Sequence, residues 1–189
     1  MNLPLIVLAG PNGAGKSTFF EAFLAELGLP FLNADNLARE TGIGAYEAAR
    51  EIAAIRDELI SRRIGFVTET VLSDPVGEKV GAFARSAKAG FDVHLIFIGI
   101  SDAQMSVRRV RSRVAAGGHD VPKEKLLARY DRCLANLERA IRSLPRVTVY
   151  DNSRFDDPYR LIAEFRDGQL VKKGVGGATP WAEHLLPKA

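Results

Sequence analysis

The chain has 189 residues, of which 47% are hydrophobic and 26% charged, and its formal net charge is +3. This composition predicts one soluble globular domain with a real core. Cys133 is the only cysteine, which excludes an intramolecular disulfide, and we expect it to be a buried thiol in a cytoplasmic protein. No run approaches the roughly 18 apolar residues that span a bilayer, which argues against a membrane anchor.

Apolar, β-branched runs alternate with segments of helical period along the chain, as in a parallel sheet with βα connections. The apolar run near the N-terminus has no basic residue before it and leads straight into a glycine loop, so we interpret it as a strand rather than a leader peptide. We expect strands at residues 5–9, 31–34, 65–70, 92–98 and 147–150. We expect helices at residues 16–27, 45–63, 76–89, 102–116 and 123–143.

The C-terminal part predicts a short β-ribbon followed by a tail, at residues 160–189. Two short apolar runs are joined by Asp167-Gly168, a dipeptide that two-residue hairpin turns prefer. After the ribbon, we expect a loop in which Trp181 and Leu185 pack back on the body.

The sequence GPNGAGKS matches G-x-x-x-x-G-K-[ST] and lies between a predicted strand and a predicted helix. In that context, main-chain N–H groups cradle phosphate, Lys16 neutralises phosphate charge, and the Ser17 hydroxyl binds Mg²⁺. A plain glycine-rich turn is the alternative. A dinucleotide-binding loop is disfavoured, because its fingerprint has a further glycine and no lysine where this loop has Gly-Lys-Ser. We therefore expect a single P-loop NTPase domain of α/β class, with its parallel central sheet flanked by helices, which binds ATP and Mg²⁺. Its nucleotide-binding residues are Gly10, Pro11, Asn12, Gly13, Ala14, Gly15, Lys16, Ser17 and Thr18.

Asp35 follows one predicted strand and Glu69 lies at the end of another, so both should share the edge of the sheet where Lys16 lies. Asp35 is a candidate base for the proton of an attacking hydroxyl, and the alternative is an N-cap for the helix that begins near Asn36. Glu69 can hold a substrate hydroxyl or the water shell of Mg²⁺, and Thr70 can donate to an acceptor. The alternative for Glu69 is that it has no function and lies at the strand end only because an acidic side chain is excluded from the core.

Residues 108–146 carry eleven Lys and Arg against four acidic residues. Within them, GGHDVP interrupts a basic helical region, which predicts a lid at about residues 105–130 that closes on ATP. Arg113 and Arg129 are the candidate lid arginines, and His119 can contact phosphate or substrate. The alternative is a solvated basic helical hairpin. No His/Cys/Asp cluster has metal-ligand spacing, which disfavours protein-held zinc or iron.

Three functions compete at this point. A small-molecule kinase would use Lys16, Asp35 and the arginines. A nucleotide-binding interaction module would bind the nucleotide but would have lost its catalytic activity. A nucleic-acid binder or kinase would use the basic segment, but that segment has a single aromatic residue, Tyr130, where stacking on bases needs several. The sequence favours the kinase and disfavours a nucleic-acid partner.

The motifs GPNGAGKST, NAD, TETVLS, RVRSRVAAGGHDVP and RYDRCLANL, in this order, resemble the zeta toxin family of P-loop kinases. The resemblance implies an ATP- and Mg²⁺-dependent kinase that phosphorylates a hydroxyl, with UDP-N-acetylglucosamine as the best-known acceptor and an antitoxin protein as a partner. It implies that Lys16 and Ser17 bind ATP–Mg²⁺, that Asp35 is the base, and that Glu69 faces the substrate. The segment GGHDVP is equally similar to the lid of sugar-acid kinases, so a sugar acid, a nucleotide or a nucleic-acid end stays open as the acceptor.

Overall fold

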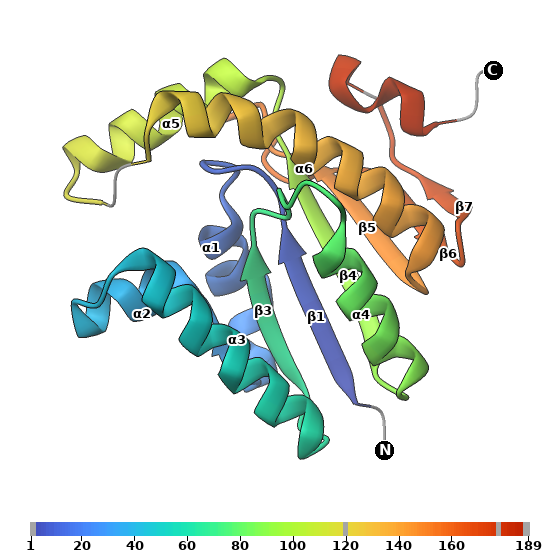
Figure 1. Ribbon diagram of the computed structural model, residues 1–189. Helices are drawn as coiled ribbons and strands as arrows, with labels where there is room; N and C mark the ends of the chain where they lie inside the picture. The colour runs from blue at the N-terminus through green and yellow to red at the C-terminus, as the bar shows by residue number, and fades with distance from the viewer. Residues whose placement is uncertain (1–2, 119–120, 177–178, 187–189) are drawn as a thin grey trace.

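The computed structural model describes residues 3–118, 121–176 and 179–186. Its centre is a seven-stranded sheet in the order β2-β3-β1-β4-β5-β6-β7 (Figure 1). The first five strands in that order are parallel, and β6 and β7 pair antiparallel. The strands are β1 (Pro4–Ala9), β2 (Phe31–Leu32), β3 (Phe66–Thr70), β4 (Asp92–Gly99), β5 (Arg146–Asp151), β6 (Arg160–Arg166) and β7 (Gln169–Lys173).

Helices connect the parallel strands, as the alternating sequence pattern predicts. The helix after β1 starts as α1 (Lys16–Phe19) and continues through a π-helical stretch (Phe20–Leu24) into a 3₁₀ turn (Ala25–Leu27). The other helices are α2 (Ala34–Thr41), α3 (Ala45–Ser61), α4 (Glu78–Lys88), α5 (Ala103–Ala115) and α6 (Lys123–Ser143). None of the helices in the described part of the chain is long and apolar enough to cross a membrane.

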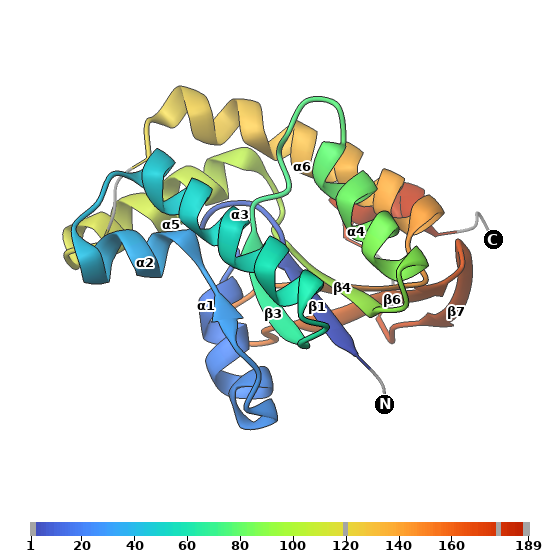
Figure 2. The same ribbon diagram turned by 60° about the horizontal axis from the view of Figure 1, so that its bottom comes forward.

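The central strands β1, β4 and β5 bury most residues on both of their faces, because helices lie on each side of the sheet, whereas β7 at the edge is mostly exposed. Along β1, Leu5 and Val7 belong to the core cluster under α3, α4 and α6, whereas Leu8 belongs to the cluster under α1. Figure 2 shows α1 on one side of the sheet and α3, α4 and α6 on the other. Successive side chains of a strand point to opposite faces, so a continuous apolar run can fill both layers.

Two details of the predicted strands and tail differ from the structure. The strand expected at residues 31–34 ends at Leu32, because Asn33 already caps the next helix. The expected C-terminal loop contains a 3₁₀ helix (Pro180–Leu185). Its Trp181 is buried in the main core and donates through Nε1 to Asp151 Oδ1 at 2.9 Å, and Leu185 packs against the same cluster, as predicted.

The predicted hairpin is confirmed by β6 and β7, which are joined by Asp167 and Gly168. Both turn residues have positive φ, 47° and 78°, the conformation that a type I′ turn requires. In the predicted lid region, α5 and the start of α6 pack on each other through Val107, Val110 and Leu126.

Candidate active site

The glycine loop joins the end of β1 to the start of α1, the setting that the motif requires. Gly10 has φ 143°, and a Cβ atom at this position would lie 2.1 Å from the carbonyl oxygen of Ile98 in β4. Only glycine therefore allows the loop to leave β1 so close to the neighbouring strand. The loop lies at the carboxyl end of the sheet, where parallel α/β folds bind their ligands.

Lys16 is buried and holds its ammonium group against the loop. Its Nζ donates to the carbonyl oxygens of Gly10 at 3.0 Å and Pro11 at 3.1 Å, and it lies 3.6 Å from Glu69 Oε1. A positive charge is thus fixed where the motif predicts phosphate.

Glu69 lies beside the loop because of strand register. β3 is the neighbour of β1, with Glu69 opposite Leu8, so the end of β3 brings the carboxylate to the loop. Glu69 Oε2 accepts from Ser17 Oγ at 3.0 Å and from Asn33 Nδ2 at 2.8 Å. The residue expected on the substrate side therefore also contacts the serine expected to bind the metal.

The oxygens of Ser17 and Glu69 suit Mg²⁺, which prefers hard oxygen ligands and keeps several waters or phosphate oxygens. The described residues contain no group of three or more His, Cys, Asp or Glu that could hold a metal ion by themselves. These two residues thus fit an ion that reaches the protein together with a nucleotide, and they do not fit an all-protein metal cage.

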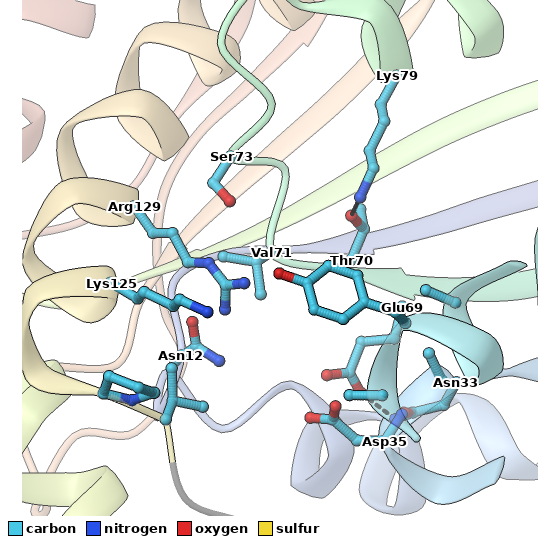
Figure 3. Close-up of a pocket in the computed structure, with 16 residues that line it drawn as sticks. Asn12, Asn33, Asp35, Glu69, Thr70, Val71, Ser73, Lys79, Lys125 and Arg129 are labelled. Atoms are coloured by element: carbon cyan, nitrogen blue, oxygen red, sulfur yellow. Dashed lines mark hydrogen bonds between the residues drawn. The ribbon is translucent and has the colours of Figure 1, made fainter. Parts of the chain in front are cut away.

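Asp35 lies in the first turn of α2, and it is not the N-cap. Asn33 has extended backbone angles and its Oδ1 accepts from the N–H groups of Asp35 at 2.8 Å and Asn36 at 3.1 Å. The capping alternative for Asp35 is therefore wrong, because the helix begins earlier than expected and Asn33 occupies the capping position. The exposed carboxylate of Asp35 points into a cavity beside Glu69 (Figure 3).

This cavity has a volume of about 300 Å³, and opposite charges face each other across it (Figure 3). Asp35 and Glu69 come from α2 and β3, and Lys125 and Arg129 come from α6 on the other side. Arg129, a candidate lid arginine from the sequence, therefore lines this cavity. The arrangement can bind a molecule that carries both a hydroxyl group and an anionic group.

Thr70 and Lys79 form the part of the cavity wall near α4. Thr70 Oγ1 accepts from Lys79 Nζ at 3.0 Å and from the N–H of Leu72 at 3.1 Å, which leaves its own hydroxyl proton for a further acceptor. Partial enclosure of the ammonium group lowers the pKa of Lys79 from its usual value, and the nearby carboxylate of Asp74 opposes this effect.

Two predicted residues that the structure describes, Arg113 and Thr18, lie outside this constellation. Arg113 is exposed on α5 and is absent from the described lining of the cavity. His119 lies outside the described residues. Thr18 is exposed in the first turn of α1, and its side chain hydrogen-bonds Tyr159, away from the acidic pair.

Sequence reasoning missed Asn33, Lys79 and Lys125 as site residues. Asn33 carried a usable signal, since asparagine before a helical segment is a preferred N-cap. Lys79 and Lys125 carried none, because a lysine on the first turn of a helix is ordinary on a surface. Asn12 was expected at the nucleotide. The structure also places it in the cavity wall, with its buried Oδ1 lacking a hydrogen-bond partner among the described residues.

Comparisons with solved structures identify the fold. A chain of the AvrRxo1-ORF1:-ORF2 complex with ATP superposes with a TM-score of 0.70 at 18% identity, over 97% of this chain and 62% of that one. A chain from the PezAT toxin-antitoxin system of Streptococcus pneumoniae gives 0.56 at 17% identity, over 87% of this chain and 71% of that one. A gluconokinase from Sinorhizobium meliloti gives 0.52 at 20% identity, over 80% and 83%.

At these identities the likeness concerns the fold alone, a mixed α/β domain. The chain spans only 62% of the length of the AvrRxo1 complex chain.

Sequence comparisons identify the family. An uncharacterized protein of Haemophilus influenzae is 30% identical over 131 residues, which is 66% of this chain and 91% of that protein. The sequence model of the family described as "Zeta toxin" matches residues 40–160, a range that contains Glu69, Lys125 and Arg129. The chain belongs to the zeta toxin family.

Proposed function

We propose that this protein is an ATP-dependent kinase that transfers the γ-phosphoryl group to a hydroxyl of a small anionic acceptor. The observation that carries the proposal is the cavity in which Asp35 and Glu69 face Lys125 and Arg129, next to the loop that holds Lys16. Membership of the zeta toxin family and the fold shared with a gluconokinase support phosphoryl transfer as the reaction class.

The nucleotide is bound by the loop from Gly10 to Ser17. Lys16 balances the charge of the β- and γ-phosphates, for which it exchanges its contacts with the loop carbonyls and Glu69. Ser17 and Glu69 would hold Mg²⁺, which supplies further neutralisation of charge on the transferring phosphoryl group.

Asp35 is proposed as the base, and the contacts of Glu69 explain the division of roles. The carboxylate of Glu69 is engaged by Ser17 and Asn33 and lies beside Lys16, whereas no hydrogen bond to the Asp35 carboxylate occurs among the described residues. As the acceptor oxygen forms its bond to the γ-phosphorus, the bond from that phosphorus to the bridging oxygen of ADP breaks. The electron pair leaves on ADP, and the hydroxyl proton passes to Asp35.

Charge in the cavity indicates the kind of acceptor. Lys79, Lys125 and Arg129 line it together, so a hydroxyl compound that also carries phosphate or carboxylate would meet a charge-assisted partner. UDP-N-acetylglucosamine has this chemistry and follows from the family resemblance, and sugar acids have it as well. We include an antitoxin protein as a proposed partner, because PezAT is described as a toxin-antitoxin system.

The test is ADP release from ATP–Mg²⁺ with a panel of acceptors: UDP-N-acetylglucosamine, gluconate, nucleotides and dinucleotides. Wild-type protein should show acceptor-dependent release and a product heavier by one phosphoryl group. Asp35→Asn should abolish transfer and leave ATP affinity nearly unchanged. Asp131→Asn, the same change at an exposed position of α6, should behave as wild type.

Two results would contradict this proposal. If Asp35→Asn turns over at the wild-type rate, Asp35 is not the base. If the protein binds ATP but none of the acceptors stimulates ADP release, the domain is a nucleotide-binding module rather than a kinase of these substrates.

A further inference from the structure

Four consecutive carbonyl groups of the glycine loop accept hydrogen bonds from side chains far away in the sequence. The donors come from α5 and from the segment that follows β5. The pairs are Ser106 Oγ to Asn12 at 2.7 Å, Arg109 Nη1 to Gly13 at 3.3 Å, Asn152 Nδ2 to Ala14 at 2.8 Å and Tyr159 OH to Gly15 at 2.9 Å.

The direction of these bonds decides where the loop's N–H groups point. In a planar trans peptide, the carbonyl and the following N–H point to opposite sides. Donors that hold the carbonyls of residues 12, 14 and 15 on one side therefore leave the N–H groups of Gly13, Gly15 and Lys16 on the opposite side, whereas the N–H of Ala14 donates to the Pro11 carbonyl at 3.2 Å. Successive inward N–H groups are the arrangement that binds phosphate.

The donors are themselves fixed in place. Arg109 Nη2 donates to the carbonyl of Asn152 at 2.8 Å, and the N–H of Asn152 donates to Gly99 at the end of β4. Ser106 and Asn152 are buried. Burial raises the pKa of the Tyr159 hydroxyl, with Thr18 and Arg109 opposing, so it remains a proton donor at neutral pH.

Gly15 shows how closely these donors approach. A Cβ atom on Gly15 would lie 2.7 Å from Asn152 Nδ2 and 3.0 Å from the Tyr159 hydroxyl. Its φ of 90° is also in the region that favours glycine. The glycine of the motif therefore makes room for side-chain donors on the outer side of the loop.

We propose that Ser106, Arg109, Asn152 and Tyr159 are positioning residues that hold the glycine loop in its phosphate-binding conformation. The proposal rests on the nucleotide-binding part of the proposed function. It gives α5 a role distinct from that of a detached lid, because the first half of this helix is fastened to the loop. Arg109 then acts through the loop backbone rather than through direct contact with phosphate.

The test compares conservative variants with matched controls. Tyr159→Phe removes one hydroxyl, and Tyr150→Phe makes the same change in a ring that also packs on Phe19 but lacks a hydrogen bond to the loop. Ser106→Ala removes the bond to Asn12. Ser86→Ala removes a buried hydroxyl that donates to the carbonyl of Ala82 within α4. Thermal unfolding of each variant checks the fold.

Binding of ATP–Mg²⁺ and of inorganic tripolyphosphate–Mg²⁺ is measured by titration calorimetry. Tyr159→Phe and Ser106→Ala should each weaken both ligands about threefold to tenfold, the effect of one hydrogen bond, and the double variant should multiply the losses. The controls should match wild type. Equal losses for both ligands identify the phosphate loop, since tripolyphosphate has no nucleoside.

Unchanged affinities in both variants would overturn the proposal, as would a loss confined to ATP, which would mean contact with the nucleoside. A wild-type protein that binds neither ligand would overturn this inference and the nucleotide site together. A wild-type protein that binds both ligands but phosphorylates no acceptor would overturn the proposed kinase activity alone, because this test is read by binding.

Discussion

Lys16 and Glu69 bring opposite charges within 3.6 Å of each other where the glycine loop meets the cavity lined by Asp35 and Arg129. Their side chains are only 6% and 12% exposed, so this pair is far less screened by solvent than the exposed Arg62–Glu58 pair at the C-terminal end of α3. The carboxylate of Glu69 also accepts hydrogen bonds from both Ser17 and Asn33. One strand end thus connects the residues proposed for ATP, metal and acceptor.

Glu69→Gln should lower kcat/KM roughly 10- to 100-fold, the effect of losing about 1.5–3 kcal/mol of hydrogen bonding to a charged group. The amide keeps the shape but removes the negative charge beside Lys16 and Ser17. Steady-state kinetics measures the effect, and Glu58→Gln is the matched control. Full activity of Glu69→Gln would show that the carboxylate has no part in transfer.

Asn33→Ala should reduce the free energy of unfolding by about 1–2 kcal/mol, because α2 loses its N-cap. It should also reduce turnover, since the cap fixes the first turn that carries Asp35. Urea denaturation and kinetics measure the two effects. Asn33→Ser keeps a capping oxygen but loses the amide that donates to Glu69, so it should retain most stability and still lose activity. Equal activity in all three proteins would argue against this link.

Arg129→Gln should raise KM for an anionic acceptor about tenfold and leave kcat and KM for ATP nearly unchanged, because Arg129 lines the cavity proposed to bind the acceptor. Arg132→Gln, one turn further along the same helix, is the control; its Nε bonds to the carbonyl of Ala128. A fall in kcat at constant KM would instead assign Arg129 to the transferring phosphoryl group, the role expected of a lid arginine.

Acid should destabilise the fold through His94. Burial, together with the charge of Arg146, lowers the pKa of His94 from 6.5 to about 4, and its Nε2 lies 2.8 Å from Thr148 Oγ1. The unfolded chain therefore gains a proton between these pH values while the folded chain does not. Stability should fall as the pH drops from 6.5 to 4, by up to about 1.4 kcal/mol per pH unit.

Urea titrations across this pH range should show a shallower decline for His94→Gln than for wild type. His184→Gln, at an exposed histidine, serves as the control. Identical pH dependence of the stability of wild type and His94→Gln would show that His94 does not cause the acid destabilisation.

Alkali should act through Cys133. This thiol is buried against the carbonyl of Val71, and burial raises its pKa from 9 to about 12. The unfolded chain loses the proton above pH 9 and the folded chain does not, so stability should fall between pH 9 and 12. At pH 8–9, iodoacetamide should label Cys133 only after unfolding, as read by mass spectrometry. Rapid labelling of the native protein would contradict this prediction.

The sequence by itself determined the alternation of strands and helices, the hairpin turn and the glycine loop between β1 and α1. These features depend on the period of apolar side chains and on backbone angles, which residues close in sequence determine. Asp167 and Gly168 both adopt positive φ in the hairpin turn. At Gly10, where the chain leaves β1, any side chain would collide with the carbonyl of Ile98. Helix ends were less well determined, and the first turn of α2 shows the consequence. A shift of one or two residues made Asn33, and not Asp35, the N-cap.

Only the tertiary structure decided which side chains complete the site. The order β3-β1-β4 places Glu69 next to the loop, and α6 brings Lys125 and Arg129 across the cavity from Asp35. The donors that hold the loop come from Ser106 and Tyr159, 94 and 144 residues away from their partners. Such contacts follow from how the strands are ordered and how the helices pack on them, which no local pattern of residues specifies.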